Sequence, residues 1–128
     1  MTNQNSKIFI IDDEPLLSEM LSDFLHEKNS TFQIQSFLTG ESSLPHLKEK
    51  PDVIILDYYL NSKEKDASNG IDILKEIKKQ DKSLPVIMLS SQERYGTAAK
   101  TIMHGAIHYV KKGKDAFDEI FKLINANT

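Results

Sequence analysis

The chain has 128 residues, a hydrophobic content of 39% and a formal net charge of −3 at pH 7. This length fits one ordinary domain, and this hydrophobic content excludes a disordered chain. The slight acidity argues against direct nucleic-acid binding, and the absence of cysteine excludes disulfides, zinc–thiolate sites and thiol catalysis. No apolar run approaches the roughly 18 residues of a membrane span, and the N-terminus lacks the features of a secretory signal. We therefore expect a cytoplasmic protein with no membrane partner.

Apolar residues alternate between strand-like and helix-like spacing along the chain. In the first half, β-branched or alternating runs predict strands over 7–11, 32–38 and 53–56. Periodic apolar positions predict helices over 16–25 and 40–49. Pro15 stands near the first turn of the first helix, where its missing N–H does no harm. Pro45 falls inside the second helix and predicts a late start or a bend there.

The second half continues the alternation after a polar, aperiodic loop over 61–70. Helices are predicted over 71–77, 98–103 and 117–124, and strands over 86–89 and 107–110. Five strand–helix units with short connections predict one α/β domain over 1–128, with its core at about 7–125. Such a domain has a parallel sheet, right-handed crossovers and helices on both faces. We expect no room for an output domain after the last helix.

Reactive side chains collect where the predicted strands end. Four of the five strands end at ionisable or hydroxyl side chains, in chain order Asp12 and Asp13, Asp57, Ser90 and Ser91, and Lys111 and Lys112. The second strand, which ends near Thr39, is the exception. In open α/β sheets the carboxyl ends of the strands share one edge, and ligands bind there. We therefore expect these side chains to form one site.

The aspartates of this edge need a counter-charge. At about 4 Å and an effective dielectric constant near 20, each pair of carboxylates repels by roughly 4 kcal/mol. Arginine could neutralise them, but Arg94 is the only arginine in the chain. A ligand set of oxygen atoms suits Mg²⁺, which together with one lysine balances three carboxylates. Mn²⁺ is the alternative ion.

Each of these residues has a simpler explanation when it is taken alone. Asp13 could serve only as an N-cap of the first helix, and Ser90 is a common residue at a strand end. Lys112 could be a solvated surface lysine. Asp57 is harder to explain in this way, because an unpaired carboxylate seldom follows a run of buried apolar residues. Their joint placement at one edge favours a functional site.

Four short segments carry a resemblance to a known family. FIIDDEP, VIILDYYL, PVIMLSS and GAIHYVKKG resemble, in order, spacing and length, the receiver domains of bacterial response regulators, including those of the chemotaxis-Y type. The resemblance implies a doubly wound, flavodoxin-like fold with five parallel strands in the order 2-1-3-4-5 and five helices on both faces. It also implies two-component signal transduction, in which a histidine kinase phosphohistidine or a histidine phosphotransfer protein phosphorylates an aspartate.

Position by position, the resemblance implies that Asp57 is the phosphoacceptor. Asp12, Asp13 and Asp57 would hold Mg²⁺ together with the backbone carbonyl of Tyr59. In this family the side chain at the position of Tyr59 lies beside the path of the water that attacks phosphorus. Gln92 could position that water, so Tyr59 and Gln92 would together set the dephosphorylation rate.

The resemblance also assigns the switch. Ser90 matches the hydroxyl residue that bonds a phosphoryl oxygen, and Tyr109 matches the aromatic residue that changes rotamer on activation. The family's lysine lies three residues after that aromatic residue, which selects Lys112 over Lys111. Phosphorylation would alter a face made by the fourth helix, fifth strand and fifth helix, where an unidentified downstream protein binds. The chain would be a signalling switch and not an enzyme, catalysing only its own phosphorylation and dephosphorylation.

The sequence departs from the family pattern in three places. Gly113 stands where the family usually has a proline after the lysine, and the connection over 57–70 is longer than usual. Pro45 disturbs the second helix. None of these differences removes a chemical group from the predicted site.

Other functions share part of this pattern. A pseudo-receiver that acts only as an interaction module would be favoured if Asp57 or Lys112 were absent. A Mg²⁺-dependent aspartyl phosphatase of the haloacid-dehalogenase type would need a second aspartate where Tyr59 stands. A flavodoxin-like FMN binder would need a Ser/Thr/Gly phosphate loop after the first strand, where Asp12 and Asp13 would repel phosphate.

Overall fold

The computed structural model describes residues 6–60, 69–91 and 95–128. Its strands are β1 (Lys7–Ile11), β2 (Gln33–Phe37), β3 (Val53–Asp57), β4 (Val86–Ser90) and β5 (His108–Lys111). Its α-helices are α1 (Pro15–Lys28), α2 (Gly40–Ser43), α3 (Gly70–Gln80), α4 (Tyr95–Met103) and α5 (Ala116–Ala126), and a 3-10 helix, η1, covers Leu44–Glu49. The strands form one parallel sheet in the order β2-β1-β3-β4-β5, which confirms the predicted fold.

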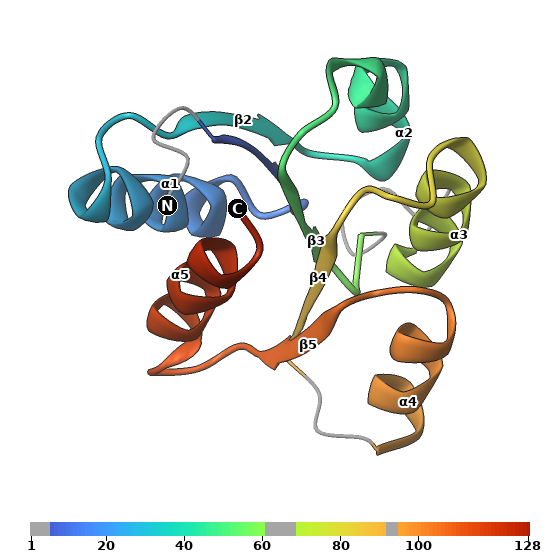
Figure 1. The fold of residues 1–128 in the computed structure, drawn as a ribbon. Coiled ribbons are helices and arrows are strands. Elements are labelled where there is room, and N and C mark those ends of the chain that lie inside the picture. The colour runs from blue at the N-terminus through green and yellow to red at the C-terminus, as the bar shows by residue number, and fades with distance from the viewer. Residues whose placement is uncertain (1–5, 61–68, 92–94) are drawn as a thin grey trace.

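Helices cover both faces of the sheet. In Figure 1, α1 and α5 lie on one face, and α2, α3 and α4 lie on the other. The side chains of β1 alternate between these two layers: Ile8 and Ile10 pack with α1 and α5, whereas Phe9 and Ile11 pack with α3 and η1. A strand that is buried on both faces needs apolar residues at every position, which explains the continuous apolar runs in the sequence.

Most of the helices bury apolar side chains against the sheet, and α4 differs from them. Leu21 and Leu25 of α1 are buried with Ile120 and Ile124 of α5, at helical spacing on each. On the opposite face, α3 and η1 bury a second set, made of Ile73, Leu74, Ile77 and Leu47. The described side chains of α4 belong to neither of these core clusters.

The large apolar side chains described in α4, those of Ile102 and Met103, are exposed. The helix expected over 98–103 is present as the second part of α4, and in it Ile102 is 47% exposed and Met103 is 83% exposed. Thr101 is buried, alone among the side chains of this helix that the structure describes, and its hydroxyl donates a hydrogen bond to the carbonyl oxygen of Ala98 at 2.8 Å. The hydroxyl is thereby satisfied within its own helix, which allows a polar side chain to be buried there.

The helix expected over 40–49 is divided in two. The α2 helix ends at Ser43, and η1 begins at Leu44, with Pro45 in its first turn. A proline at this position of a continuous α-helix would remove a backbone hydrogen bond and clash with the preceding turn. The bend that Pro45 predicted is therefore present as a change of helix type.

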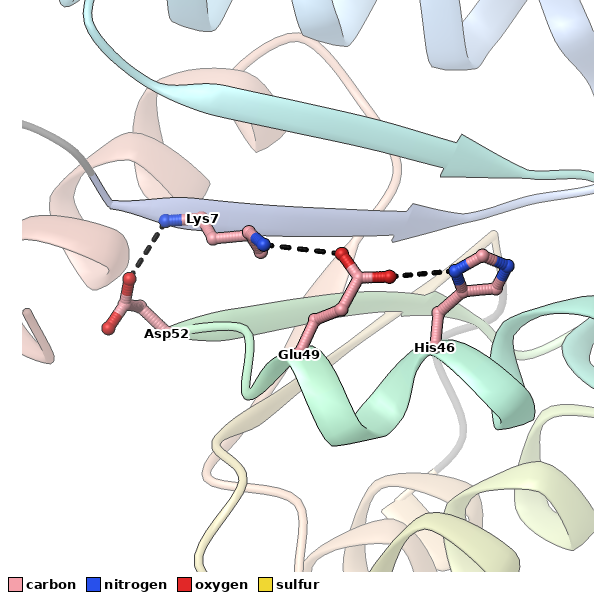
Figure 2. A network of polar contacts seen from close by, with 4 residues as sticks. All are labelled: Lys7, His46, Glu49 and Asp52. Atoms are coloured by element: carbon pink, nitrogen blue, oxygen red, sulfur yellow. Dashed lines mark hydrogen bonds and ion pairs between the residues drawn. The ribbon is translucent and has the colours of Figure 1, made fainter.

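A network of polar contacts joins η1 to the start of β1 (Figure 2). Lys7 Nζ lies 3.2 Å from Glu49 Oε1, and His46 Nδ1 lies 2.8 Å from Glu49 Oε2. The backbone N–H of Lys7 donates to Asp52 Oδ2 at 2.8 Å. The hydrogen bonds from His46 and Lys7 hold the pKa of Glu49 below its usual range. This network attaches η1 to the amino end of the sheet.

None of the helices in the described part of the chain is long and apolar enough to cross a membrane.

Candidate functional site

The carboxyl ends of the strands meet at one edge of the sheet, and backbone hydrogen bonds continue past the last strand residues. The N–H of Tyr58 donates to the carbonyl of Leu89 at 2.9 Å, and the N–H of Lys112 donates to the carbonyl of Ser90 at 2.7 Å. Among the described residues every peptide bond is trans, including the one between Lys112 and Gly113. The backbone that presents the predicted site is therefore held by the sheet itself.

Asp12, Asp13 and Asp57 form a buried acidic cluster. One carboxylate oxygen from each lies within 4.8 Å of the others, and the three residues are 1%, 6% and 2% exposed. Asp12 Oδ2 has no hydrogen-bond partner among the described residues. Burying carboxylates so close together is unfavourable unless a cation compensates them. The oxygen-only donor set, with an oxygen that accepts no hydrogen bond, fits a divalent cation of the Mg²⁺ type.

Lys112 supplies one positive charge to this cluster. Its Nζ atom lies 3.3 Å from Asp57 Oδ1 and 3.5 Å from Asp12 Oδ2. Burial alone would lower the pKa of Lys112, but attraction by Asp57 and then by Asp12 outweighs burial, and the pKa is raised. Lys112 therefore stays protonated, and a single lysine leaves the cluster of three carboxylates with an excess of negative charge.

The burial and crowding of the carboxylates raise the pKa of two of them, Asp57 and Asp12. Burial, followed by repulsion from Asp12, raises the pKa of Asp57 to about 7, against the opposing effect of Lys112. Burial also raises the pKa of Asp12, although the backbone N–H of Glu14 and the charge of Lys112 oppose it. In the absence of a metal ion, Asp57 is thus only partly ionised near neutral pH.

Backbone N–H groups orient two of the carboxylates. The N–H of Glu14 donates to Asp12 Oδ1 at 2.9 Å, and the N–H of Tyr59 donates to Asp57 Oδ1 at 3.3 Å. Asp57 Oδ1 therefore accepts a hydrogen bond from the N–H of Tyr59 and forms an ion pair with Lys112. Asp57 Oδ2 makes no hydrogen bond or ion pair with the described residues. This arrangement leaves Oδ2 available as a nucleophile or a ligand.

Gly70 was not singled out in the sequence, yet it lies directly against the backbone of the site. Its N–H donates to the carbonyl of Tyr58 at 2.8 Å. A Cβ atom at Gly70 would lie 2.5 Å from the carbonyl oxygen of Asp57 and 2.7 Å from the Cα atom of Tyr58. Only glycine allows α3 to begin this close to the end of β3. The signal available in the sequence was a glycine at a helix start, which alone does not reveal such an approach.

The other residues predicted for the site are Ser90, Tyr109, Tyr59 and Gln92. Ser90 is fully buried at the end of β4, and Tyr109 of β5 is half-buried against the core cluster that includes α3. Tyr59 is half-buried, with its ring centroid 4.8 Å from that of Tyr58. Gln92 lies outside the described residues. The roles assigned to these residues stay predictions.

Comparison with known proteins identifies the family. A family model described as the response regulator receiver domain matches residues 8–125. The probable C4-dicarboxylate response regulator DctR of Bacillus subtilis (strain 168) is 30% identical over 113 residues, which make up 88% of this chain and 48% of DctR. The protein-glutamate methylesterase/protein-glutamine glutaminase of the same organism is 37% identical over 91 residues, which make up 70% of this chain and 24% of that protein. The chain thus spans about half the length, or less, of these curated relatives.

Solved structures agree on the fold. The receiver domain of the Francisella response regulator 1452 has a TM-score of 0.80 at 24% identity, with 95% of each chain covered. The BeF3-activated DrrB receiver domain has a TM-score of 0.79 at 25% identity, with 94% of this chain and 95% of that chain covered. Because the family model spans almost the whole chain and the strand order agrees with it, the chain belongs to the response regulator receiver domain family of two-component systems.

Proposed function

We propose that residues 7–125 form a single phosphoacceptor domain in which Asp57 takes a phosphoryl group from a phosphohistidine. The donor is a sensor histidine kinase or a histidine phosphotransfer protein. The observation that carries this proposal is the buried position of Asp57 at the end of β3, within reach of Asp12, Asp13 and Lys112. Membership in a family of phosphorylation-dependent signalling switches supports it.

The proposed reaction is a transfer between two side chains. Asp57 Oδ2 attacks phosphorus while the P–N bond to the donor imidazole breaks, and the imidazole keeps the electron pair of that bond. Lys112 and the hydroxyl of Ser90 lie at the same edge and would bind the phosphoryl oxygens. The N–H of Tyr59 holds Asp57 Oδ1 and so fixes the direction in which Oδ2 points.

A metal ion would be held by the carboxylates of Asp12, Asp13 and Asp57 and by the backbone carbonyl of Tyr59. Mg²⁺ fits this oxygen donor set, and Mn²⁺ is the alternative. When bound, the ion supplies positive charge next to the transferred phosphoryl group. It would also relieve the repulsion that raises the pKa of Asp57.

The proposed output is a change at the face made by α4, β5 and α5. A phosphoryl group makes the site more negative by about one charge and adds acceptor oxygens. Ser90 and Lys112 would move toward these oxygens, and Tyr109 would change rotamer. The exposed side chains of Ile102 and Met103 give α4 an apolar surface for a downstream protein. No direct contact with nucleic acid or membrane is part of this function.

Intact-mass spectrometry after incubation with acetyl phosphate and Mg²⁺ tests the acceptor. We expect the wild-type protein to gain one phosphoryl group, and we expect no gain for Asp57→Asn. The matched control is Asp72→Asn, which removes an exposed carboxylate from α3 and should leave the gain unchanged. Phosphorylation that persists in Asp57→Asn would place the acceptor elsewhere.

Intact-mass spectrometry together with a phosphate-release assay separates the alternative functions. A pseudo-receiver would bind its partners but gain no mass from acetyl phosphate or from a phosphorylated histidine kinase. An aspartyl phosphatase would release many equivalents of phosphate from an unactivated phosphate monoester, which a receiver domain does not use as a phosphoryl donor. A receiver domain gains the group, holds it and loses it slowly.

A further inference from the structure

A pocket lies between the C-terminal ends of α3 and α4, at the amino ends of β4 and β5 and thus at the opposite edge of the sheet from Asp57. Its volume is about 500 Å³. Six side chains line it, those of Lys75, Lys78, Lys79, Lys82, Met103 and His104, and Gly105 completes it. We refer to it as the lysine pocket.

The charge of the lysine pocket is one-sided. Its lining contains four lysines and no carboxylate, in a chain whose net charge is −3. The ammonium groups of Lys75, Lys79 and Lys82 make no ion pair with the described residues. Lys75 and Lys79 are one helical turn apart, where like charges repel each other.

Helix polarity accounts for only part of this cluster. The carbonyl end of α3 favours cations in its last turn, which explains a positive charge at Lys78 and Lys79. It does not explain Lys75, which lies earlier in α3, or Lys82, which follows the helix. Nor does it explain why the C-terminal end of α4 adds His104 and an apolar side chain to the same hollow.

Lys78 forms a fixed wall of the pocket. Its Nζ atom donates to the carbonyl oxygens of Leu84 at 2.6 Å and Lys82 at 3.2 Å. Its methylene carbons pass over Gly105, where an added Cβ atom would lie 3.1 to 3.3 Å from them. Burial lowers the pKa of Lys78. Lys78 is therefore held in place, whereas Lys75, Lys79 and Lys82 project into solvent.

Met103 adds an apolar contact at the rim. It is 83% exposed, the highest value among the large hydrophobic side chains that the structure describes. Ile102 beside it is 47% exposed. Methionine is flexible and polarizable, and exposed methionines adapt to varied apolar side chains of a partner. The pocket therefore combines positive charge with an apolar edge.

We propose that the lysine pocket binds an acidic peptide segment of a partner protein, with carboxylates placed at Lys75, Lys79 and Lys82 and an apolar side chain against Met103. A free phosphate ion fits less well, because the ammonium of Lys78 is already bound to two carbonyls and the N–H of Gly105 donates to Ile102. A nucleic acid fits less well, because the pocket has no aromatic side chain other than His104 on which a base could stack.

Fluorescence anisotropy with a labelled synthetic peptide of alternating acidic and leucine residues tests this proposal. We expect the wild-type protein to bind the peptide, and we expect Lys75→Glu/Lys79→Glu to weaken binding on the order of tenfold. Met103→Ser should weaken binding to a smaller extent. The matched control is Lys28→Glu/Lys48→Glu, which reverses the same number of exposed charges on α1 and η1 and should leave the affinity unchanged.

Two further probes decide the class of ligand. A peptide with serine in place of leucine should bind more weakly, and a single-stranded oligonucleotide of matched charge should not displace the acidic peptide. Equal losses in the control and pocket variants, equal affinity of the serine peptide, displacement by the oligonucleotide, or no binding of the leucine peptide would each overturn the proposal. Circular dichroism of each variant confirms that the fold is retained.

Discussion

At the scale of single residues, the buried carboxylates at the sheet edge should act together in metal binding. We expect the wild-type protein to bind Mg²⁺ with an affinity in the millimolar range, and we expect Asp13→Asn to weaken it by at least roughly tenfold. The measurement is a Mg²⁺ titration followed by the amide shifts of residues around Asp12, Asp13 and Asp57. Asp23→Asn, on the exposed surface of α1, is the control. Shifts that stay constant at high Mg²⁺ concentration would contradict the assignment.

We expect Tyr59 to lengthen the lifetime of the phosphorylated state. Its phenol ring is bulky and packs against the ring of Tyr58, so it should obstruct a water that attacks phosphorus in line. Gln92 would oppose this effect by positioning a water. We expect obstruction to dominate, because in-line attack has strict geometry. Tyr59→Asn should therefore speed phosphate loss roughly tenfold, which corresponds to about 1.4 kcal/mol in the barrier.

Phosphate release from isolated phosphoprotein measures this effect. Gln92→Ala serves as the comparison and should slow the release or leave it unchanged. Equal rates for the wild type and Tyr59→Asn would show that the Tyr59 side chain points away from the phosphoryl group.

At the scale of secondary-structure elements, the contact between the start of α3 and the end of β3 determines the shape of the site. We expect Gly70→Ala to displace α3 from β3, because its Cβ would meet backbone atoms of Asp57 and Tyr58 that cannot rotate away. Overpacking of this kind destabilises by about 1–3 kcal/mol. Displacement of the Tyr59 carbonyl should also weaken Mg²⁺ binding. Urea unfolding and a Mg²⁺ titration on the same protein measure the two effects.

Gly113→Ala is the control for Gly70→Ala. Gly113 lies close to the site along the chain, but an added Cβ there would meet no atom within 4 Å. We expect its stability and Mg²⁺ affinity to stay near those of the wild type. Equal behaviour of the two variants would show that the close approach of Gly70 has no effect on the site.

The sequence predicted the elements well where one physical signal dominated. Asp57 and Ser90 end strands that are buried on both faces, so the position of the strand also gave the position of the side chain. The orientation of α4 was not predictable in the same way. Its small residues have no strong preference for the core, and Thr101 could be buried only because its hydroxyl bonds within the helix. The role of Gly70 was not predictable from the sequence, because it depends on the close approach of α3 to the backbone of Asp57 and Tyr58 in the folded structure.

At the scale of the whole molecule, alternating strands and helices predict a parallel sheet but do not give its strand order. Several orders satisfy right-handed crossovers and short connections. The order 2-1-3-4-5 was implied by the family resemblance and is the order observed. That order brings β1 between β2 and β3, which places Asp12 and Asp13 beside Asp57.

The acidic cluster should reduce the stability of the metal-free protein. Its folded state raises the pKa of Asp57 from 3.8 to about 7, so ionised Asp57 opposes folding. Stability should therefore increase as the pH falls from above 7 toward 4, because the folded state binds more protons than the unfolded state in this range. Asp57→Asn should stabilise the metal-free protein at pH 8 by roughly 2–3 kcal/mol.

Thermal unfolding with and without Mg²⁺ checks this prediction. Mg²⁺ should stabilise the wild type by mass action and should stabilise Asp57→Asn much less. Asp23→Asn is again the control and should follow the wild type under both conditions. A metal-free Asp57→Asn protein that melts below the wild type at pH 8 would contradict the prediction.

The shallow anchoring of α4 has a consequence for local unfolding. Helices whose apolar side chains are buried open only when much of the molecule opens, whereas a helix with few buried contacts opens by itself at a lower free energy. Amide hydrogens in α4 should therefore exchange with deuterium faster than those in the middle of α1 or α5, which hydrogen-exchange mass spectrometry can measure. Comparable protection in all three helices would contradict this expectation. A helix that opens at low free energy can be repositioned by a modest change in charge, while the core clusters on both faces of the sheet stay intact.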